Sequence, residues 1–396
     1  MTANRDTIYS ERKLFAASCA GMLLFGMAML LLGTVNTYLA EKFHLDQIGI
    51  GSLAALFPVG ILAGSLVFGP IVDRLGYKLP LSIASLVLAA GFLMTARAES
   101  FLVIQSSFFL IGFGGGVING GTNALVAEIS GDNRGARLSL LGVFFGIGAL
   151  GVPAMTGLLQ PSFNYSEIIG GFGVAVFLPA TLFMSIRFPA PKQAQGLPLS
   201  QMMGLFRDKT LLVLGMVLFF ESAAEGLANN WTPAYLQQSE NLTPEYSLLM
   251  LTLLSASLTA GRLVLGWALK RYPSQVVLLF CLAAALAGAF LLNAASDRVI
   301  AAFAVILMGI GFSAAFPVIF SFFGGLYPNL TGTAIGVALV IALVGNTFLN
   351  YVLGVVAQAW GIGIFPMYMV GVLVCLAIFL FFGLRTYSLR ISTSRN

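Results

Sequence analysis

Residues 64–74, GSLVFGPIVDR, return 197 positions later as residues 261–271, GRLVLGWALKR, counted from Gly64 to Gly261. The two segments share Gly, Leu, Val, Gly and Arg in register. The same offset relates six further pairs of identical residues: Tyr38 and Tyr235, Leu39 and Leu236, Gly112 and Gly309, Gly114 and Gly311, Gly135 and Gly332, and Gly148 and Gly345. Because self-similarity at a fixed period marks an internal repeat, we predict a chain built from two related halves.

The composition is that of a polytopic membrane protein. Of the 396 residues, 58% are hydrophobic and only 9% are charged, with a mean hydropathy of +0.94, whereas soluble globular chains carry about 25% charged residues. Cys19, Cys281 and Cys375 fall in separate apolar runs and His44 is the single histidine, so neither a disulfide framework nor a metal site is indicated. No arrangement of nucleophile, base and metal is visible, and we therefore expect a protein that is not an enzyme and needs no cofactor.

Apolar segments of about 20 residues are long enough to cross a bilayer. We expect twelve of them, near residues 14–40, 48–72, 79–96, 101–127, 138–160, 165–186, 210–236, 246–268, 275–294, 299–324, 331–358 and 361–384. The first is too long for the core of a signal peptide and reads as a span. The predicted fold is all-α, with twelve transmembrane helices in two pseudo-symmetric six-helix bundles, residues 1–186 and 210–396, joined by a polar linker at residues 187–209.

The net charge of +5 is explained by membrane orientation and does not require a nucleic-acid partner. If both termini are cytoplasmic, every Lys and Arg falls on the cytoplasmic side except Lys42, Arg97 and Arg298. That grouping, which counts Arg262 and Arg390 as cytoplasmic, follows the positive-inside rule. We expect a monomer in the bacterial inner membrane with both termini in the cytoplasm.

The seventh span, LFFESAAEGLANNWTPAYL at residues 218–236, carries two acids. Glu221, Glu225 and Asn229 are spaced four apart and form one stripe on a helix. A charge near the bilayer centre costs about 2.5–3.5 kcal/mol or more, and neighbouring carboxylates repel, so at least one is expected to hold a proton. We predict that Glu225 is the proton-coupling residue and Glu221 its modulator. The structural alternative is an acid pair buried against hydroxyls or an arginine.

Amide side chains recur inside other spans. Such side chains donate and accept hydrogen bonds, and several that converge on one cavity suit a polyhydroxylated solute. The alternative for each amide is a bond between helices, worth about 0.6 kcal/mol. The predicted substrate-binding residues are Asn36, Asn119, Asn123, Asn229, Trp231, Asn346 and Asn350.

Residues 69–78, GPIVDRLGYK, resemble the loop signature Gly-x-x-x-Asp-Arg-x-Gly-x-Lys/Arg of major facilitator superfamily transporters. The resemblance covers essentially the whole chain and implies a central cavity with alternating access by rocking of the two halves. Glycines at this loop allow close helix approach and a tight turn. The resemblance points to a conformational latch made of Gly69, Asp73, Arg74, Gly76, Lys78 and Arg134.

Longer segments, including GGTNALVAEISGDNRGARLSLLGVFFGIGALGVP and AEGLANNWTPAYL, resemble the fucose–galactose–glucose:proton symporter branch. This implies import of a monosaccharide by symport with a cation, a proton or sodium. The branch's acid on the fourth helix is matched here by Asn119, so coupling would rest on Glu221 and Glu225. The alternative is a proton-coupled exporter, for which GIGALGVP at Gly146–Pro153 is a partial motif; a receptor or scaffold is disfavoured because no sizeable soluble domain is present.

Overall fold

The structure is a computed structural model and describes residues 9–130, 134–189, 205, 207–240, 242–295, 297–327 and 331–395. Within these residues, all regular secondary structure is helical. Twelve helical segments of this described part are long and apolar enough to cross a membrane, which confirms the predicted number of spans. Residues 190–204 of the predicted linker lie outside the described residues.

The chain divides into two compact units. Unit 1 comprises residues 1–31 and 59–197, and unit 2 comprises residues 32–58 and 198–396. Unit 2 thus includes the end of α1 (Glu11–Phe43) and the beginning of α2 (Gln47–Leu75). The sequence boundaries at residues 186 and 210 describe the repeat and remain a prediction.

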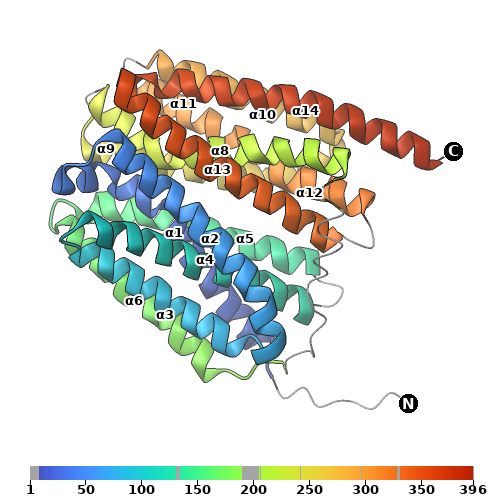
Figure 1. The fold of residues 1–396 in the computed structure, drawn as a ribbon, viewed down its shortest axis with the longest axis horizontal. Coiled ribbons are helices and arrows are strands. Elements are labelled where there is room, and N and C mark those ends of the chain that lie inside the picture. The colour runs from blue at the N-terminus through green and yellow to red at the C-terminus, as the bar shows by residue number, and fades with distance from the viewer. Residues whose placement is uncertain are drawn as a thin grey trace. The chain divides into compact units, whose positions relative to one another are not determined.

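Unit 1 contains the rest of α1 and α2 and four complete helices (Figure 1). In this unit α3 lies between α4 and α6 and packs against both. Asn164 caps the start of α6, because its side chain accepts from the Glu167 N–H while Glu167 accepts from the Asn164 N–H. The four helices are α3 (Lys78–Arg97), α4 (Phe101–Ile129), α5 (Arg134–Leu159) and α6 (Tyr165–Ser185).

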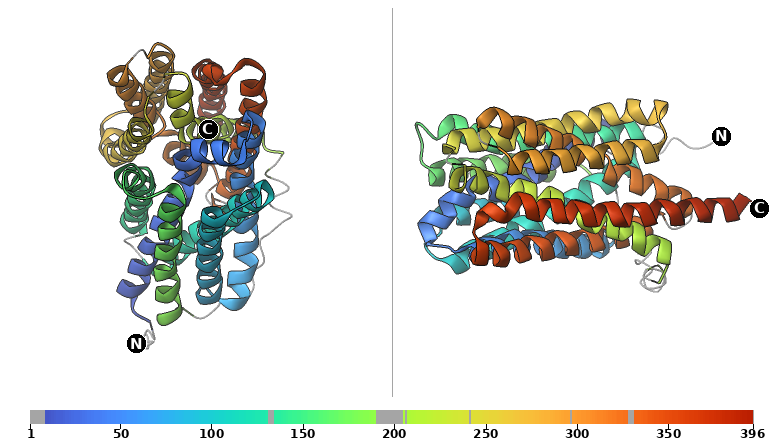
Figure 2. Two further views of the ribbon diagram at one scale, coloured as in Figure 1. Left: turned by 90° about the vertical axis from the view of Figure 1, so that its left-hand side faces the viewer. Right: turned by 90° about the horizontal axis from the view of Figure 1, so that it is seen from above.

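Unit 2 is organised around α8 (Lys209–Gln238), which packs against helices on several sides. Figure 2 shows α14 as a long continuous helix that ends near the C-terminus. The other elements of this unit are α9 (Pro244–Arg271), α10 (Ser274–Asn293), α11 (Arg298–Gly311), α12 (Ala315–Leu326), α13 (Thr331–Trp360), η2 (Ile362–Ile364) and α14 (Phe365–Arg395).

Glycines related by the repeat serve the same packing purpose in both units. A Cβ added at Gly114 in α4 would lie 2.7 Å from the Ala84 oxygen of α3, and one added at Gly311 in α11 would lie 2.5 Å from Ala285 Cβ of α10. The absence of a side chain lets the helix backbones approach closely. The repeat seen in the sequence therefore corresponds to equivalent helix crossings.

The tenth predicted span, residues 299–324, is not one continuous helix. It consists of α11, ending at Gly311, and α12, beginning at Ala315. Pro317 has no N–H to donate to the Ser313 carbonyl four residues earlier, and its ring clashes with that carbonyl. In addition, the Ser313 hydroxyl donates to the Ile310 carbonyl at 2.7 Å. These two residues explain the interruption.

Candidate functional site

The acidic stripe of the seventh span lies on α8, as predicted. Glu221 is 2% exposed and Asn229 is 6% exposed, whereas the Glu225 side chain retains 13% exposure. The Oε1 atom of Glu221 has no hydrogen-bond partner among the described residues. The two acids therefore occupy different surroundings although they are one helical turn apart.

Arg262 of α9 supplies the counter-charge of this stripe. Its Nη2 lies 3.7 Å from Glu225 Oε2, and its side chain is 31% exposed. Arg262 lies within α9, a candidate span, as the predicted span at residues 246–268 placed it, although the charge grouping counted it with the cytoplasmic bases. The repeat register agrees, because Arg262 aligns with Ser65 inside the second predicted span.

Asn350 of α13 is the centre of an amide network in unit 2. Its Oδ1 accepts from Asn230 Nδ2 and from Trp231 Nε1, both at 3.1 Å. Its Nδ2 donates to the backbone and side-chain oxygens of Asn346, at 2.9 and 3.0 Å, and Asn346 Nδ2 donates to the Ser222 carbonyl at 2.8 Å. Three predicted binding residues are thus brought together, and in this structure they hydrogen-bond one another.

The end of α1 joins the same network. Asn36 Nδ2 donates to the Asn230 carbonyl at 2.8 Å, and Gly33 lies against the Asn229 backbone so closely that an added Cβ would overlap its carbonyl oxygen. Asn230 was not predicted as a site residue, although the Asn229-Asn230 pair in the sequence marks it. The amides of this unit therefore join α1, α8 and α13.

The predicted amides of unit 1 form a separate pair on α4. Asn123 Nδ2 donates to the Asn119 backbone oxygen at 2.9 Å and to its Oδ1 at 3.0 Å. Met22 Sδ of α1 lies 3.8 Å from the same nitrogen. Both asparagines are only partly buried, and their contact with a solute remains a prediction.

The loop signature is described in part. Gly76 adopts φ 72°, the left-handed conformation that favours glycine, at the turn between α2 and α3. Tyr77 Oη donates to Glu128 Oε2 at 2.9 Å and so ties the turn to the end of α4; Lys78 begins α3 and is exposed. The structure does not describe the surroundings of Gly69 or the side chains of Asp73, Arg74 and Arg134, and the latch remains a prediction.

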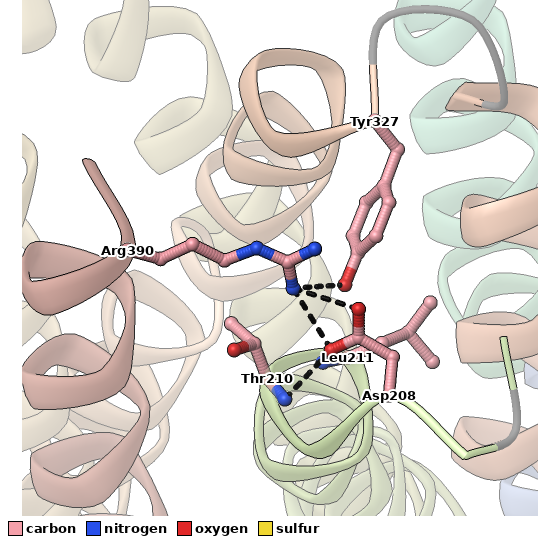
Figure 3. A network of polar contacts seen from close by, with 5 residues as sticks. All are labelled: Asp208, Thr210, Leu211, Tyr327 and Arg390. Carbon is pink, nitrogen blue, oxygen red and sulfur yellow. Dashed lines mark hydrogen bonds and ion pairs between the residues drawn. The ribbon is translucent and has the colours of Figure 1, made fainter. Parts of the chain in front are cut away.

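A polar cluster at the start of α8 was not predicted (Figure 3). Arg390 Nη1 donates to Asp208 Oδ2 at 2.7 Å and Oδ1 at 2.9 Å, and to the Tyr327 hydroxyl at 3.1 Å. Asp208 also caps α8 by accepting from the N–H groups of Thr210 and Leu211. Burial alone raises the pKa of Asp208, but the hydrogen bonds from Arg390, Tyr327 and the Leu211 N–H outweigh it and hold that pKa below its usual value.

No three His, Cys, Asp or Glu side chains in the described part of the chain lie close enough together to hold a metal ion. The site described above supplies the carboxyls of Glu221 and Glu225, the guanidinium of Arg262 and several amides from membrane-spanning helices. Such groups can bind protons and hydrogen-bond polar solutes. In this structure they are the principal candidates for chemistry.

Comparisons with known proteins show what the whole chain is similar to. The Major Facilitator Superfamily profile matches residues 17–348. The mouse sodium-dependent glucose transporter 1A is 25% identical over 154 residues, covering 37% of this chain and 36% of that protein. The 3-(3-hydroxy-phenyl)propionate transporter of Escherichia coli strain K12 is 27% identical over 251 residues, covering 62% of this chain and 61% of that protein. The chain thus spans about a third of the first relative's length.

Solved structures share the fold at low sequence identity. A point mutant of the nucleoside transporter NupG superposes with a TM-score of 0.80 at 15% identity, covering 94% of this chain and 99% of that one. A D-xylose–proton symporter gives a TM-score of 0.77 at 15% identity, covering 92% of this chain and 97% of that one. With twelve membrane-length helical segments in its described part and a family match over most of its length, the chain belongs to the Major Facilitator Superfamily.

Proposed function

We propose that this transporter imports a small polar solute, a monosaccharide, by symport with a proton. The observation that carries the proposal is the carboxyl pair Glu221 and Glu225 beside Arg262 inside the membrane-spanning part of unit 2. Intramembrane acids are costly and mark ion pathways far more often than structural contacts. Alternating access between the two halves would move the solute and the proton together.

Amide chemistry and the relatives support a sugar. Asn119 and Asn123 are partly buried on α4, while Asn229 is buried on the same stripe as the acids. The amide network of unit 2 supplies further donors and acceptors once its internal hydrogen bonds are exchanged for hydrogen bonds to a solute. Its predicted binding residues are Asn36, Trp231, Asn346 and Asn350. Relatives named as glucose transporters and a fold neighbour named as a D-xylose–proton symporter point to the same substrate class.

The coupling proton resides on the Glu221–Glu225 pair in this proposal, and the sequence prediction makes Glu225 the principal residue. In that sequence prediction, Glu225→Gln abolishes accumulation driven by a pH gradient but retains exchange, because the amide resembles the protonated acid. We further propose a monomer in the bacterial inner membrane with both termini in the cytoplasm.

Uptake into proteoliposomes tests this function directly. Purified protein is given a panel of labelled monosaccharides under three conditions, an imposed pH gradient, an imposed sodium gradient and no gradient. Accumulation of one sugar with the pH gradient alone is the expected result. Accumulation with the sodium gradient alone would replace the proton by sodium, and extrusion of lipophilic cations with no sugar uptake would favour the exporter.

A further inference from the structure

A small cavity lies inside unit 2 beside the acidic stripe. Its volume is about 10 Å³, and residues of α8, α10, α11, α12 and α14 line it. A cavity must offer about 10–15 Å³ to a water-sized sphere in order to hold one water molecule. The cavity therefore has room for one water molecule and no larger ligand.

Glu221 is the acidic side chain of this cavity, and its Oε1 has no partner among the described residues. The residue is 2% exposed, and that oxygen receives no hydrogen bond from them. Cys281 also lines the cavity, and the other lining residues are aliphatic or glycine. A buried polar group without a hydrogen bond has lost its hydration without compensation. We therefore expect a water molecule in the cavity that hydrogen-bonds the Glu221 carboxyl.

The interruption of the tenth span lies at the same cavity. Gly311, the last residue of α11, and Ala315, the first of α12, both line it. Unwound backbone at membrane depth is tolerated where it is buried in protein or lines a water-containing cavity. Residues 311–315 are buried, so the interruption meets this condition with or without a water molecule.

Glu221 has one acid, one base and one thiol as ionisable neighbours. The ionisable groups facing it are Glu225 on its own helix, Arg262 of α9 and Cys281 of α10, and the cavity residues of α11, α12 and α14 are uncharged. Arg262 lies 3.7 Å from Glu225. With both glutamates ionised, the three residues Glu221, Glu225 and Arg262 together carry one net negative charge. One bound proton makes this set neutral. The acid that forms the ion pair with Arg262 is Glu225.

We propose that Glu221 is a buried proton-binding site, in which the neutral acid and one water molecule hydrogen-bond inside this cavity while Glu225 stays ionised against Arg262. This role in transport rests on the proposed function, and it reverses the order of the two acids predicted from the sequence. The lining side chains supply one carboxyl and one thiol, whereas sodium, a hard cation, binds through several oxygen ligands.

Infrared spectroscopy of the full-length protein in lipid membranes tests the assignment. At neutral pH, the wild-type protein should show the carbonyl band of a protonated carboxyl in an apolar site, and the band should shift in D₂O. Glu221→Gln should remove this band, whereas the matched variant Glu225→Gln should keep it. Arg262→Gln should add a second band, because Glu225 then loses its counter-ion and takes up a proton.

Several results would overturn the proposal. These are a wild-type protein without the band, a band that persists in Glu221→Gln, a band that is lost in Glu225→Gln, and a band that sodium removes. If Glu221→Gln does not fold, Glu221→Asp should move the band, and an unchanged band would assign the proton elsewhere. The spectra need no solute, so failure of sugar uptake would refute the proposed function without changing this outcome.

Discussion

Gly33→Ala should force the end of α1 away from α8. The new Cβ would overlap the Asn229 carbonyl oxygen and lie 2.8 Å from its carbon, with Leu251 Cδ2 at 3.3 Å. The obstructing atoms are helix backbone, so no side-chain rotation relieves the clash. Overpacking of this kind costs about 1–3 kcal/mol, and about 2 kcal/mol changes a two-state ratio about 30-fold.

A cysteine at position 36 reports the change. Asn36 is 2% exposed at this crossing, so in a background without Cys19, Cys281 and Cys375 the introduced Asn36→Cys thiol should react slowly with a membrane-impermeant maleimide. This substitution removes the Asn36 hydrogen bond from every sample, and the comparison then isolates the steric effect.

We assume that the thiol reacts only in a state in which α1 has moved away from α8, and that this state stays the less populated one. The labelling rate should then rise about 30-fold in Gly33→Ala. Gly371→Ala is the matched control, because no atom lies within 4 Å of its added Cβ. Equal labelling rates in the two variants would show that α1 and α8 do not need this close approach.

Three further outcomes follow from single contacts. Asp208→Asn keeps a helix cap but loses the ion pair with Arg390. Because the pKa of Asp208 is lowered in the folded state, the ionised carboxyl stabilises the fold at neutral pH, and this stabilisation is lost as the pH falls below about 4. Thermal unfolding measured against pH should show that loss in the wild type and not in the variant. Trp231→Phe keeps the buried ring but removes the donor to Asn350, and its unfolding free energy should fall by about 0.6 kcal/mol, whereas a loss above about 2 kcal/mol would mean that packing dominates. Asn123→Ala should weaken equilibrium sugar binding by about 1–3 kcal/mol, and unchanged affinity in both this variant and Asn119→Ala would move the solute site elsewhere.

Patterns that repeat along the chain were predictable from the sequence. Hydrophobic length gave the twelve spans, and the 197-residue offset identified Gly114 and Gly311, which make equivalent helix crossings. These features depend on local composition and on a register that the chain itself displays. The interruption after Gly311 was missed because Pro317 in an apolar run does not disturb hydropathy, although it disturbs hydrogen bonding.

Partnerships between distant side chains were harder to predict. The acids of α8 were identified because charge is rare in a span, but nothing local to Glu225 names Arg262 as its counter-ion. Similarly, Asn350 and Trp231 were both expected to contact a solute, and only the packing of α8 on α13 shows that they bond each other. Which polar groups satisfy one another depends on tertiary packing.

The internal repeat suggests uncharged replacements for Glu221, Glu225 and Arg262, so these three residues of unit 2 can be replaced together. At the 197-residue offset, the first half has uncharged residues at all three positions, Leu24 for Glu221, Ala28 for Glu225 and Ser65 for Arg262. Removing one partner of a buried pair is strongly destabilising, whereas replacing the whole pair by residues of similar packing is often neutral or stabilising by about 1–4 kcal/mol. Arg262→Ser alone should therefore lower the thermal unfolding midpoint, and the triple variant Glu221→Leu, Glu225→Ala, Arg262→Ser should recover it while losing accumulation driven by a pH gradient. If the triple variant is as unstable as Arg262→Ser, the three residues hold unit 2 together, and the functional explanation of their charge is wrong.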